Sequence, residues 1–305
     1  SVETWVFLLC LITWLILYIG GYQSLEKILL AMVFTFSIVT LIIAIAMQST
    51  PFSIQADDIL GGLSFKFPTE HTALALAVFG FTGISYGEIM AYTYWCKEKG
   101  YSDHDGDPKQ VRNWIKTMQT DVWITVFLVT IGTIPFFLLG ASILNSQGLY
   151  PPPNGDIIQT LLVMFTSILG EWARWFFIPL TFFVLFSTFL SGTAAFTRTI
   201  SDYFISMGLI AEKGNTRQTL IHYIAFLIPA FSCLAYFILP NPILLLMIAG
   251  IWAALGLPIV NIGALYLVNK LEKELQPSNL TKIILTITLV FQLGIAGLLI
   301  FSQMS

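Results

Sequence analysis

The sequence predicts an all-α protein, a bundle of helices that crosses a membrane several times. Of its 305 residues, 56% are hydrophobic and only 10% are charged, and the mean hydropathy is +0.82. A soluble domain carries about 25% charged residues. The apolar residues also gather into runs of about 20 residues, the length that crosses the hydrocarbon core of a bilayer. The lipid bilayer is therefore the first expected partner.

Eight of these runs are long enough for spanning helices, and we expect them to form a single transmembrane domain over residues 1–305. The expected spans are residues 4–20, 27–48, 72–95, 121–144, 172–197, 219–239, 243–267 and 284–302. A ninth apolar stretch, 157–169, is too short to span. We expect it to form a short helix that lies at the membrane surface or dips into it.

The basic residues support this count of spans. Of the 14 Lys and Arg residues, 12 fall in or beside alternate connections, and only Lys66 and Arg174 fall in the others. Since cytoplasmic loops carry an excess of Lys and Arg, the 12 mark the cytoplasmic side and both ends of the sequence fall outside. The protein is therefore expected to be a multi-pass integral protein, and we place it in the cell membrane.

Several classes of function are not indicated. A net charge of −3 predicts no nucleic-acid partner. The three cysteines form no CxxC pair, so neither a disulfide framework nor a zinc site is expected. The loop residues Asp103, His104, Asp105 and Asp107 lack the spacing of a calcium-binding EF-hand and predict a solvated turn. No catalytic motif is present, so we expect neither an enzyme nor a bound cofactor.

The third expected span carries the one unusual polar segment, "GFTGISYGEIMAYTYW" from Gly80 to Trp95. Glu88 lies at membrane depth, where a carboxylate costs about 2.5–3.5 kcal/mol on insertion scales and usually marks an ion or proton pathway. Thr82, Ser85, Glu88 and Tyr92 follow one another at steps of three, three and four residues. On a helix, these residues would form one polar stripe.

Two interpretations of this segment remain open. In the first, Gly83 and Gly87 form a close helix-packing face, and Glu88 is a hydrogen-bonded structural residue. In the second, the glycines let the helix unwind and expose backbone carbonyl groups to a cation, as in the broken helices of secondary transporters. We expect the second: an interruption between about Thr82 and Gly87, with Glu88 facing the protein interior. Thr82, Ser85 and Glu88 are then candidate metal ligands.

Other polar residues in the apolar runs are weaker candidates. Asn261, in the seventh span, could bind a cation through its amide, but hydrogen bonding between helices is the commoner role. Asp121 is expected at an interface, and Glu171 and Arg174 are expected to form an ion pair at a helix end. His71 and His222 have no partner at metal-ligand spacing.

Three segments resemble the Nramp family of divalent metal transporters. "GGYQSLEKILLAMVFTFSIVTLIIAIA" is similar to the connection between the family's fourth and fifth helices. "AVFGFTGISYGEIMAYTYW" resembles the sixth helix, with its A-x-x-G-A-T-V-M-P-H pattern, and "AALGLPIV" resembles the tenth. The resemblance implies a LeuT-like inverted-repeat transporter fold with a divalent cation as transported substrate. The eight spans then correspond to helices four to eleven. The family's first three helices, the expected further partner from the same protein, have no counterpart, so we expect the 305 residues alone not to transport.

The resemblance also implies a site and its departures from the family pattern. In this register Ile84 holds the position of the metal-binding carbonyl, Gly87 that of the methionine, and Gly256 that of the tenth-helix glutamine. A methionine is lost and Glu88 is gained, which shifts the expected substrate toward hard cations such as Mg²⁺ or Mn²⁺. Two alternatives stay open: a LeuT-fold transporter of an organic solute, and a non-transporting membrane scaffold or sensor.

Overall fold

The computed structural model describes residues 2–19, 22–64, 72–101, 108–150, 157–239, 241–271, 273 and 275–304, and every regular element in these ranges is helical. This confirms the expected all-α class. His71, Lys66 and the loop residues Asp103, His104, Asp105 and Asp107 lie outside the described residues, so the calcium question stays untested. The main helices are α1 (Val2–Ile19), α2 (Tyr22–Met47), α3 (Ala56–Gly62), α4 (Thr72–Phe81), α5 (Tyr86–Glu98), α6 (Pro108–Leu139), α7 (Ile157–Leu169), α8 (Arg174–Ser206), α9 (Thr216–Ile238), α10 (Pro242–Lys270) and α11 (Asn279–Met304).

Six of the described helices are long and apolar enough to cross a membrane, and each matches one of the eight expected spans. They are α2, α6, α8, α9, α10 and α11. The other two expected spans have a different form. The first is α1, which is apolar but slightly short, and the third is divided into α4 and α5. The protein is thus a multi-pass helical membrane protein, and the count of eight crossings stays a prediction.

The chain folds into two compact units, each built from two separate stretches of sequence. Unit 1 comprises Ser1–Ile59 and Thr125–Asn241, and unit 2 comprises Leu60–Ile124 and Pro242–Ser305. Helix α6 contributes its first part to unit 2 and its second part to unit 1. The expectation of a single transmembrane domain is not tested by this division.

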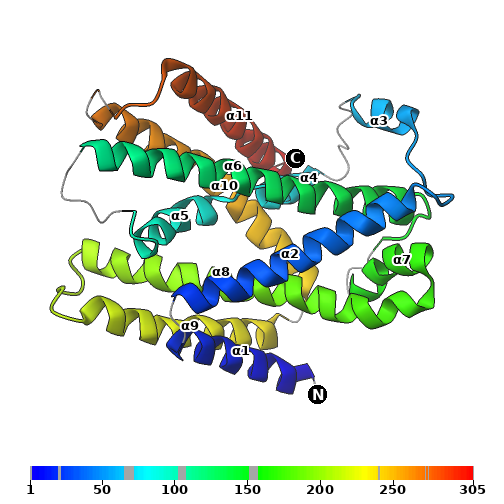
Figure 1. The fold of residues 1–305 in the computed structure, drawn as a ribbon, viewed down its shortest axis with the longest axis horizontal. Coiled ribbons are helices and arrows are strands. Elements are labelled where there is room, and N and C mark those ends of the chain that lie inside the picture. Colours follow the sequence, from blue (N-terminus) through cyan, green and yellow to red (C-terminus); the bar gives the residue numbers. More distant parts are fainter. Residues whose placement is uncertain are drawn as a thin grey trace. The chain divides into compact units, whose positions relative to one another are not determined.

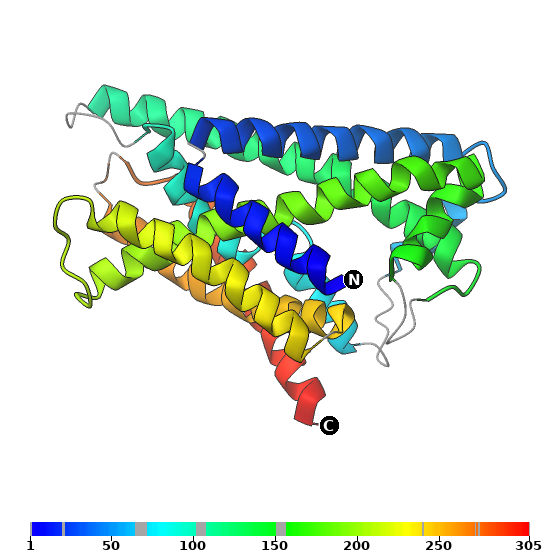
Figure 2. The ribbon, with the colours of Figure 1, turned by 90° about the horizontal axis from the view of Figure 1, so that it is seen from below.

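Unit 1 is held together by α8, which packs against α2 and α9, and by the pairing of α1 with α9. Figure 2 shows α1 and α9 side by side and antiparallel. The core of the unit is formed where α2, the end of α6 and α8 meet, and its large buried side chains include Ile43, Met47, Leu139, Ile143, Met164, Phe165 and Phe177.

The short helix α7 belongs to this core. Its Met164 and Phe165 side chains are fully buried, and the ring of Phe165 lies 4.7 Å from that of Phe177 on α8. The sequence correctly predicts a short helix here. Its apolar face, however, packs against protein, because α2, α8 and the π-helical turn Gly140–Asn145 supply an apolar surface for it.

Unit 2 is built around α10, which contacts α4, α5 and α11 (Figure 1). At the crossing of α4 and α10 the two backbones touch. A Cβ atom built on Gly80 would lie 2.0 Å from the carbonyl oxygen of Gly250, and one built on Gly250 would lie 2.6 Å from that of Ala77. Only glycine fits at such a distance, so α4 is fixed against α10 one residue before it ends.

Candidate functional site

The expected interruption of the third span is confirmed. Helix α4 ends at Phe81 and α5 begins at Tyr86, so residues 82–85 are unwound. Gly83 has a φ of +91°, in the left-handed region that side chains with a Cβ rarely adopt. Thr82 closes the last turn of α4: its backbone N–H and its hydroxyl donate to the carbonyl of Val78 at 2.8 and 2.7 Å.

This geometry tests the packing interpretation at Gly83. A Cβ on Gly83 would meet nothing within 4 Å, so Gly83 is not part of a packing face. The close approach belongs to Gly80 instead, where α4 meets α10. The packing interpretation is therefore wrong for Gly83, which is needed for the turn of the backbone.

Ser85 and Glu88 explain why a new helix starts where it does. Ser85 is the N-cap of α5, with an extended backbone (φ −78°, ψ 170°), and its N–H donates to Oε2 of Glu88 at 2.5 Å. A Ser followed three residues later by Glu is the sequence signature of a helix start. That signal is present in the sequence as "SYGE", and it gives the structural role of Glu88 a specific form, the capping of α5.

Glu88 is exposed in the structure, so the expectation that it faces the protein interior is wrong for the described chain. The physical reason is local. The free N–H groups and the positive end of the helix dipole stabilise a carboxylate in the first turn. Glu88 therefore folds back toward the start of α5, one of its oxygens accepts the N–H of Ser85, and Gly87 lies beside it in the same turn.

The interruption juxtaposes two helix ends of opposite polarity. The last turn of α4 presents carbonyl oxygens that have no partner within the helix, and these attract cations. The first turn of α5 presents N–H groups, and Glu88 offsets their positive charge. Chemically, Thr82, Ile84 and Ser85 supply backbone oxygens and two hydroxyl groups beside one carboxylate. This is an oxygen-rich donor set, of the kind that hard cations prefer.

Helix α10 forms one wall beside the interruption. Gly250 contacts α4, and Gly256, six residues later, contacts Tyr86, the first residue of α5. A rise of 1.5 Å per residue separates these two glycines by about 9 Å. Both sides of the unwound segment therefore rest on the same stretch of α10.

Asn261 lies on α10 but pairs with α11. Its Nδ2 donates to Oε1 of Gln292 at 3.1 Å and to the carbonyl of Leu285 at 3.4 Å, and both amide side chains are buried. Asn261 thus forms a hydrogen bond between helices, which the sequence analysis gave as the commoner role of such an amide. Its Oδ1 is buried and accepts no hydrogen bond from the described residues. No described contact joins Asn261 to residues 82–88.

Two further expectations can be compared with the structure. Glu171 and Arg174 form the expected ion pair at 3.5 Å, and both are well exposed. Asp121 does more than mark an interface: it accepts a hydrogen bond from the hydroxyl of Tyr101 at 2.9 Å and lies 3.4 Å from Nζ of Lys99. These contacts, together with the hydroxyl of Tyr92 donating to the carbonyl of Met118 at 3.2 Å, connect α5 and the turn after it to the first half of α6.

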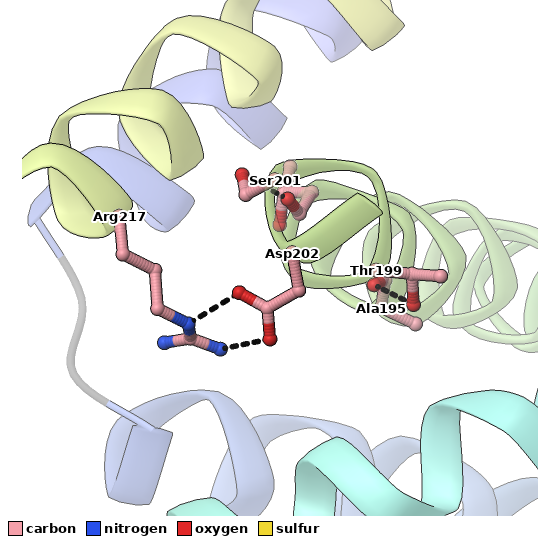
Figure 3. Close-up of polar contacts among 6 residues, drawn as sticks. Ala195, Thr199, Ser201, Asp202 and Arg217 are labelled. Atoms are coloured by element: carbon pink, nitrogen blue, oxygen red, sulfur yellow. Dashed lines mark hydrogen bonds and ion pairs between the residues drawn. The ribbon is translucent and has the colours of Figure 1, made fainter. Parts of the chain in front are cut away.

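One polar contact was missed by the sequence analysis. Arg217 at the start of α9 binds Asp202 near the end of α8 through two hydrogen bonds, Nε to Oδ1 at 2.6 Å and Nη2 to Oδ2 at 3.3 Å (Figure 3). Both side chains are about four-fifths buried. Their separation of 15 residues gives no local pattern, unlike the spacing of three residues between Glu171 and Arg174. The pair closes the turn between α8 and α9.

Within the described ranges, no three His, Cys, Asp or Glu side chains come together in a way that could hold a metal ion. Any cation site here would therefore depend on backbone, hydroxyl and amide oxygens as well as on a carboxylate. A discontinuous helix with such oxygens is typical of secondary transporters.

The fold and this segment thus define a polytopic α-helical membrane protein with one of its expected spans interrupted. The model of the Nramp family (natural resistance-associated macrophage protein-like) matches residues 1–302, so the chain belongs to the Nramp family. Its function class is therefore that of the divalent metal transporters. The comparison with curated proteins found no match.

Proposed function

We propose that this protein is a secondary transporter that moves a hard divalent cation, Mn²⁺ or Mg²⁺, across the cell membrane, and that the unwound segment 82–85 forms part of its cation site. The observation that supports this most strongly is the interruption itself. Unwound backbone at membrane depth is tolerated where it lines a cavity or is buried in protein, and the family of this chain transports divalent metals.

The proposed donors are oxygens. The unwound segment contains the backbone carbonyl of Ile84 and the backbone carbonyl and hydroxyl oxygens of Thr82 and Ser85. Glu88 supplies the carboxylate from the adjoining first turn of α5. Gly87 stands where the family pattern has a methionine, so no thioether is present at that position. A donor set of oxygens without sulfur favours Mg²⁺ and Mn²⁺ over soft metals.

Further donors are required, because Mg²⁺ takes six oxygen ligands in near-octahedral geometry. We assign these further donors to water molecules and to the first three helices of the family pattern. Asn261 is kept as a more distant candidate through its Oδ1, since its Nδ2 already donates to Gln292 and Leu285.

Glu88→Gln tests the proposal, because it separates two roles of the same side chain. Glutamine can replace glutamate in a capping arrangement, since its amide oxygen also accepts a backbone N–H. The substitution should therefore leave the melting temperature close to that of the wild type. Loss of the charge should lower Mn²⁺ uptake by roughly tenfold or more, since a charged ligand contributes more to binding a cation than a neutral amide.

Glu212→Gln is the matched control, because Glu212 is an exposed carboxylate in the connection between α8 and α9. Its uptake should equal that of the wild type. If Glu88→Gln takes up Mn²⁺ as well as the wild type does, Glu88 is only a helix cap. If the wild-type protein at its natural length takes up no divalent cation in cells or vesicles, the transport proposal fails, and a scaffold, a sensor or an organic-solute transporter remains.

A further inference from the structure

Tyr86 and Gly256 are in unusually close contact across α5 and α10. A Cβ atom built on Gly256 would lie 2.5 Å from Cδ1, 2.7 Å from Cγ and 2.9 Å from Cε1 of the Tyr86 ring. Real Cβ atoms essentially never come within 3.0 Å of a neighbour, so any other residue at position 256 would force a displacement. The ring occupies the space that a side chain on α10 would fill.

The displacement cannot be absorbed at the far end of a flexible side chain. The atoms concerned include Cγ, which is one bond from the Cβ of Tyr86 and is rigidly connected to the rest of the ring. Relief would require a change of the Tyr86 rotamer or a shift of its backbone. That backbone is the first residue of α5 and directly follows the unwound segment.

Helix α10 is also packed closely against α4. Six residues earlier its backbone is in direct contact with α4, through Gly80 and Gly250. Interiors packed at this density transmit strain instead of absorbing it. A side chain at position 256 would therefore push the start of α5 while the end of α4 stays in place.

From this geometry we propose that Gly256 is a positioning residue and that the Tyr86 ring is the spacer that fixes where α5 begins relative to α4. The pair thereby sets the separation between the carbonyl end of α4 and the carboxylate of Glu88, and so the size of cation that the segment accepts. This inference rests on the proposed function for its substrate, but the contact itself can be tested without transport.

The test is a double-mutant cycle between Gly256→Ala and Tyr86→Ala in the protein at its natural length. Gly256→Ala alone should lower the melting temperature and raise the KM for Mn²⁺ uptake by roughly tenfold, because a displacement of about 1 Å is enough to impair a binding site. Combined with Tyr86→Ala, the clash disappears, so the double variant should have a higher melting temperature than the sum of the single effects predicts.

Two controls accompany the cycle. Gly263→Ala lies on the same helix, where a Cβ would meet nothing within 4 Å, and it should leave both the melting temperature and the KM unchanged. Tyr86→Phe keeps the ring and removes only the hydroxyl, so it should keep the wild-type KM.

In addition, Tyr86→Ala should change the ratio of Mn²⁺ to Mg²⁺ uptake, which a purely structural contact would not alter.

The outcomes separate this inference from the proposed function. Additive effects of the two substitutions on the melting temperature would overturn the spacer role, whatever is transported. An unchanged KM in Gly256→Ala would overturn the positioning role. If the two substitutions have non-additive effects on the melting temperature but the wild type takes up no Mn²⁺, the spacer contact is supported. Its role in cation selection is then overturned.

Discussion

Helix α8 and the α4–α5 segment contain similar kinds of residue but fold differently. Helix α8 is continuous over 33 residues, although it contains Pro179, Gly192 and several buried hydroxyl side chains. The α4–α5 segment also contains glycine and hydroxyl side chains, and it is interrupted for four residues. The number of helix-weakening residues therefore does not decide whether a membrane helix breaks.

The difference lies in the backbone conformation of the glycine and in the residues that follow it. In α8 the hydroxyl groups donate back to their own helix, for example Thr193 to the carbonyl of Phe189 at 2.7 Å and Ser201 to that of Thr197 at 2.6 Å. In the interrupted segment, Gly83 turns the chain into the left-handed region and Ser85 with Glu88 begins a second helix. A left-handed glycine combined with a helix-start signature breaks the helix, whereas hydroxyls that return to the backbone do not.

The largest effect is expected from Gly80→Ala. The added Cβ would lie 2.0 Å from the carbonyl oxygen of Gly250, and neither backbone can yield locally. The destabilisation should reach about 3 kcal/mol, the upper range for overpacking. Gly192→Ala in α8 is the control, because a Cβ there meets nothing within 4 Å and alanine favours a helix. Thermal unfolding in detergent measures both, and equal stability of the two variants would contradict the backbone contact.

A smaller effect is expected from Gly83→Ala. Its φ of +91° is strained for any residue with a Cβ, which costs about 1–3 kcal/mol, although there is space for the methyl group. The strain should distort the unwound segment more than the rest of the protein. Uptake of Mn²⁺ should therefore decrease clearly, whereas the melting temperature should decrease only slightly. If Gly83→Ala behaves like Gly192→Ala in both measurements, the left-handed turn is not required.

The smallest effect on stability is expected from a matched pair of Thr→Val substitutions. Thr82 and Thr193 make the same kind of bond, from the hydroxyl to the carbonyl four residues earlier, and each should lose less than about 1.5 kcal/mol. Only Thr82→Val should reduce Mn²⁺ uptake, because Thr82 lies in the proposed site. A similar loss of uptake in Thr193→Val would show that the hydroxyl in α8 matters as much.

The sequence predicts the class of fold and the place of the interruption because both depend on local composition. Runs of apolar residues locate the helices, and the glycines near Glu88 locate the break. The orientation of Glu88 was predicted wrongly, because the cost of a carboxylate in a membrane was weighed and its ability to cap a helix was not. The signature from Ser85 to Glu88 would have corrected this.

Other features depend on residues far apart in the sequence and were not predictable from it. The contact of Gly80 with Gly250 joins positions 170 residues apart, and nothing local distinguishes Gly80 from Gly83. The same holds for Tyr86 with Gly256 and for Asp202 with Arg217. Asn261 was open to two roles, and only the position of Gln292 on the neighbouring helix favours the structural one.

The central claim is that a divalent cation binds at the unwound segment, and the most direct test is to locate Mn²⁺ in the protein. Anomalous diffraction from crystals of the protein grown with Mn²⁺ would place the ion without reference to uptake. We predict a peak within coordination distance of backbone or side-chain oxygens of residues 82–88, with α4 and α5 still separate. A peak elsewhere in the molecule, or a continuous helix through Ile84 when Mn²⁺ is bound, would contradict the account.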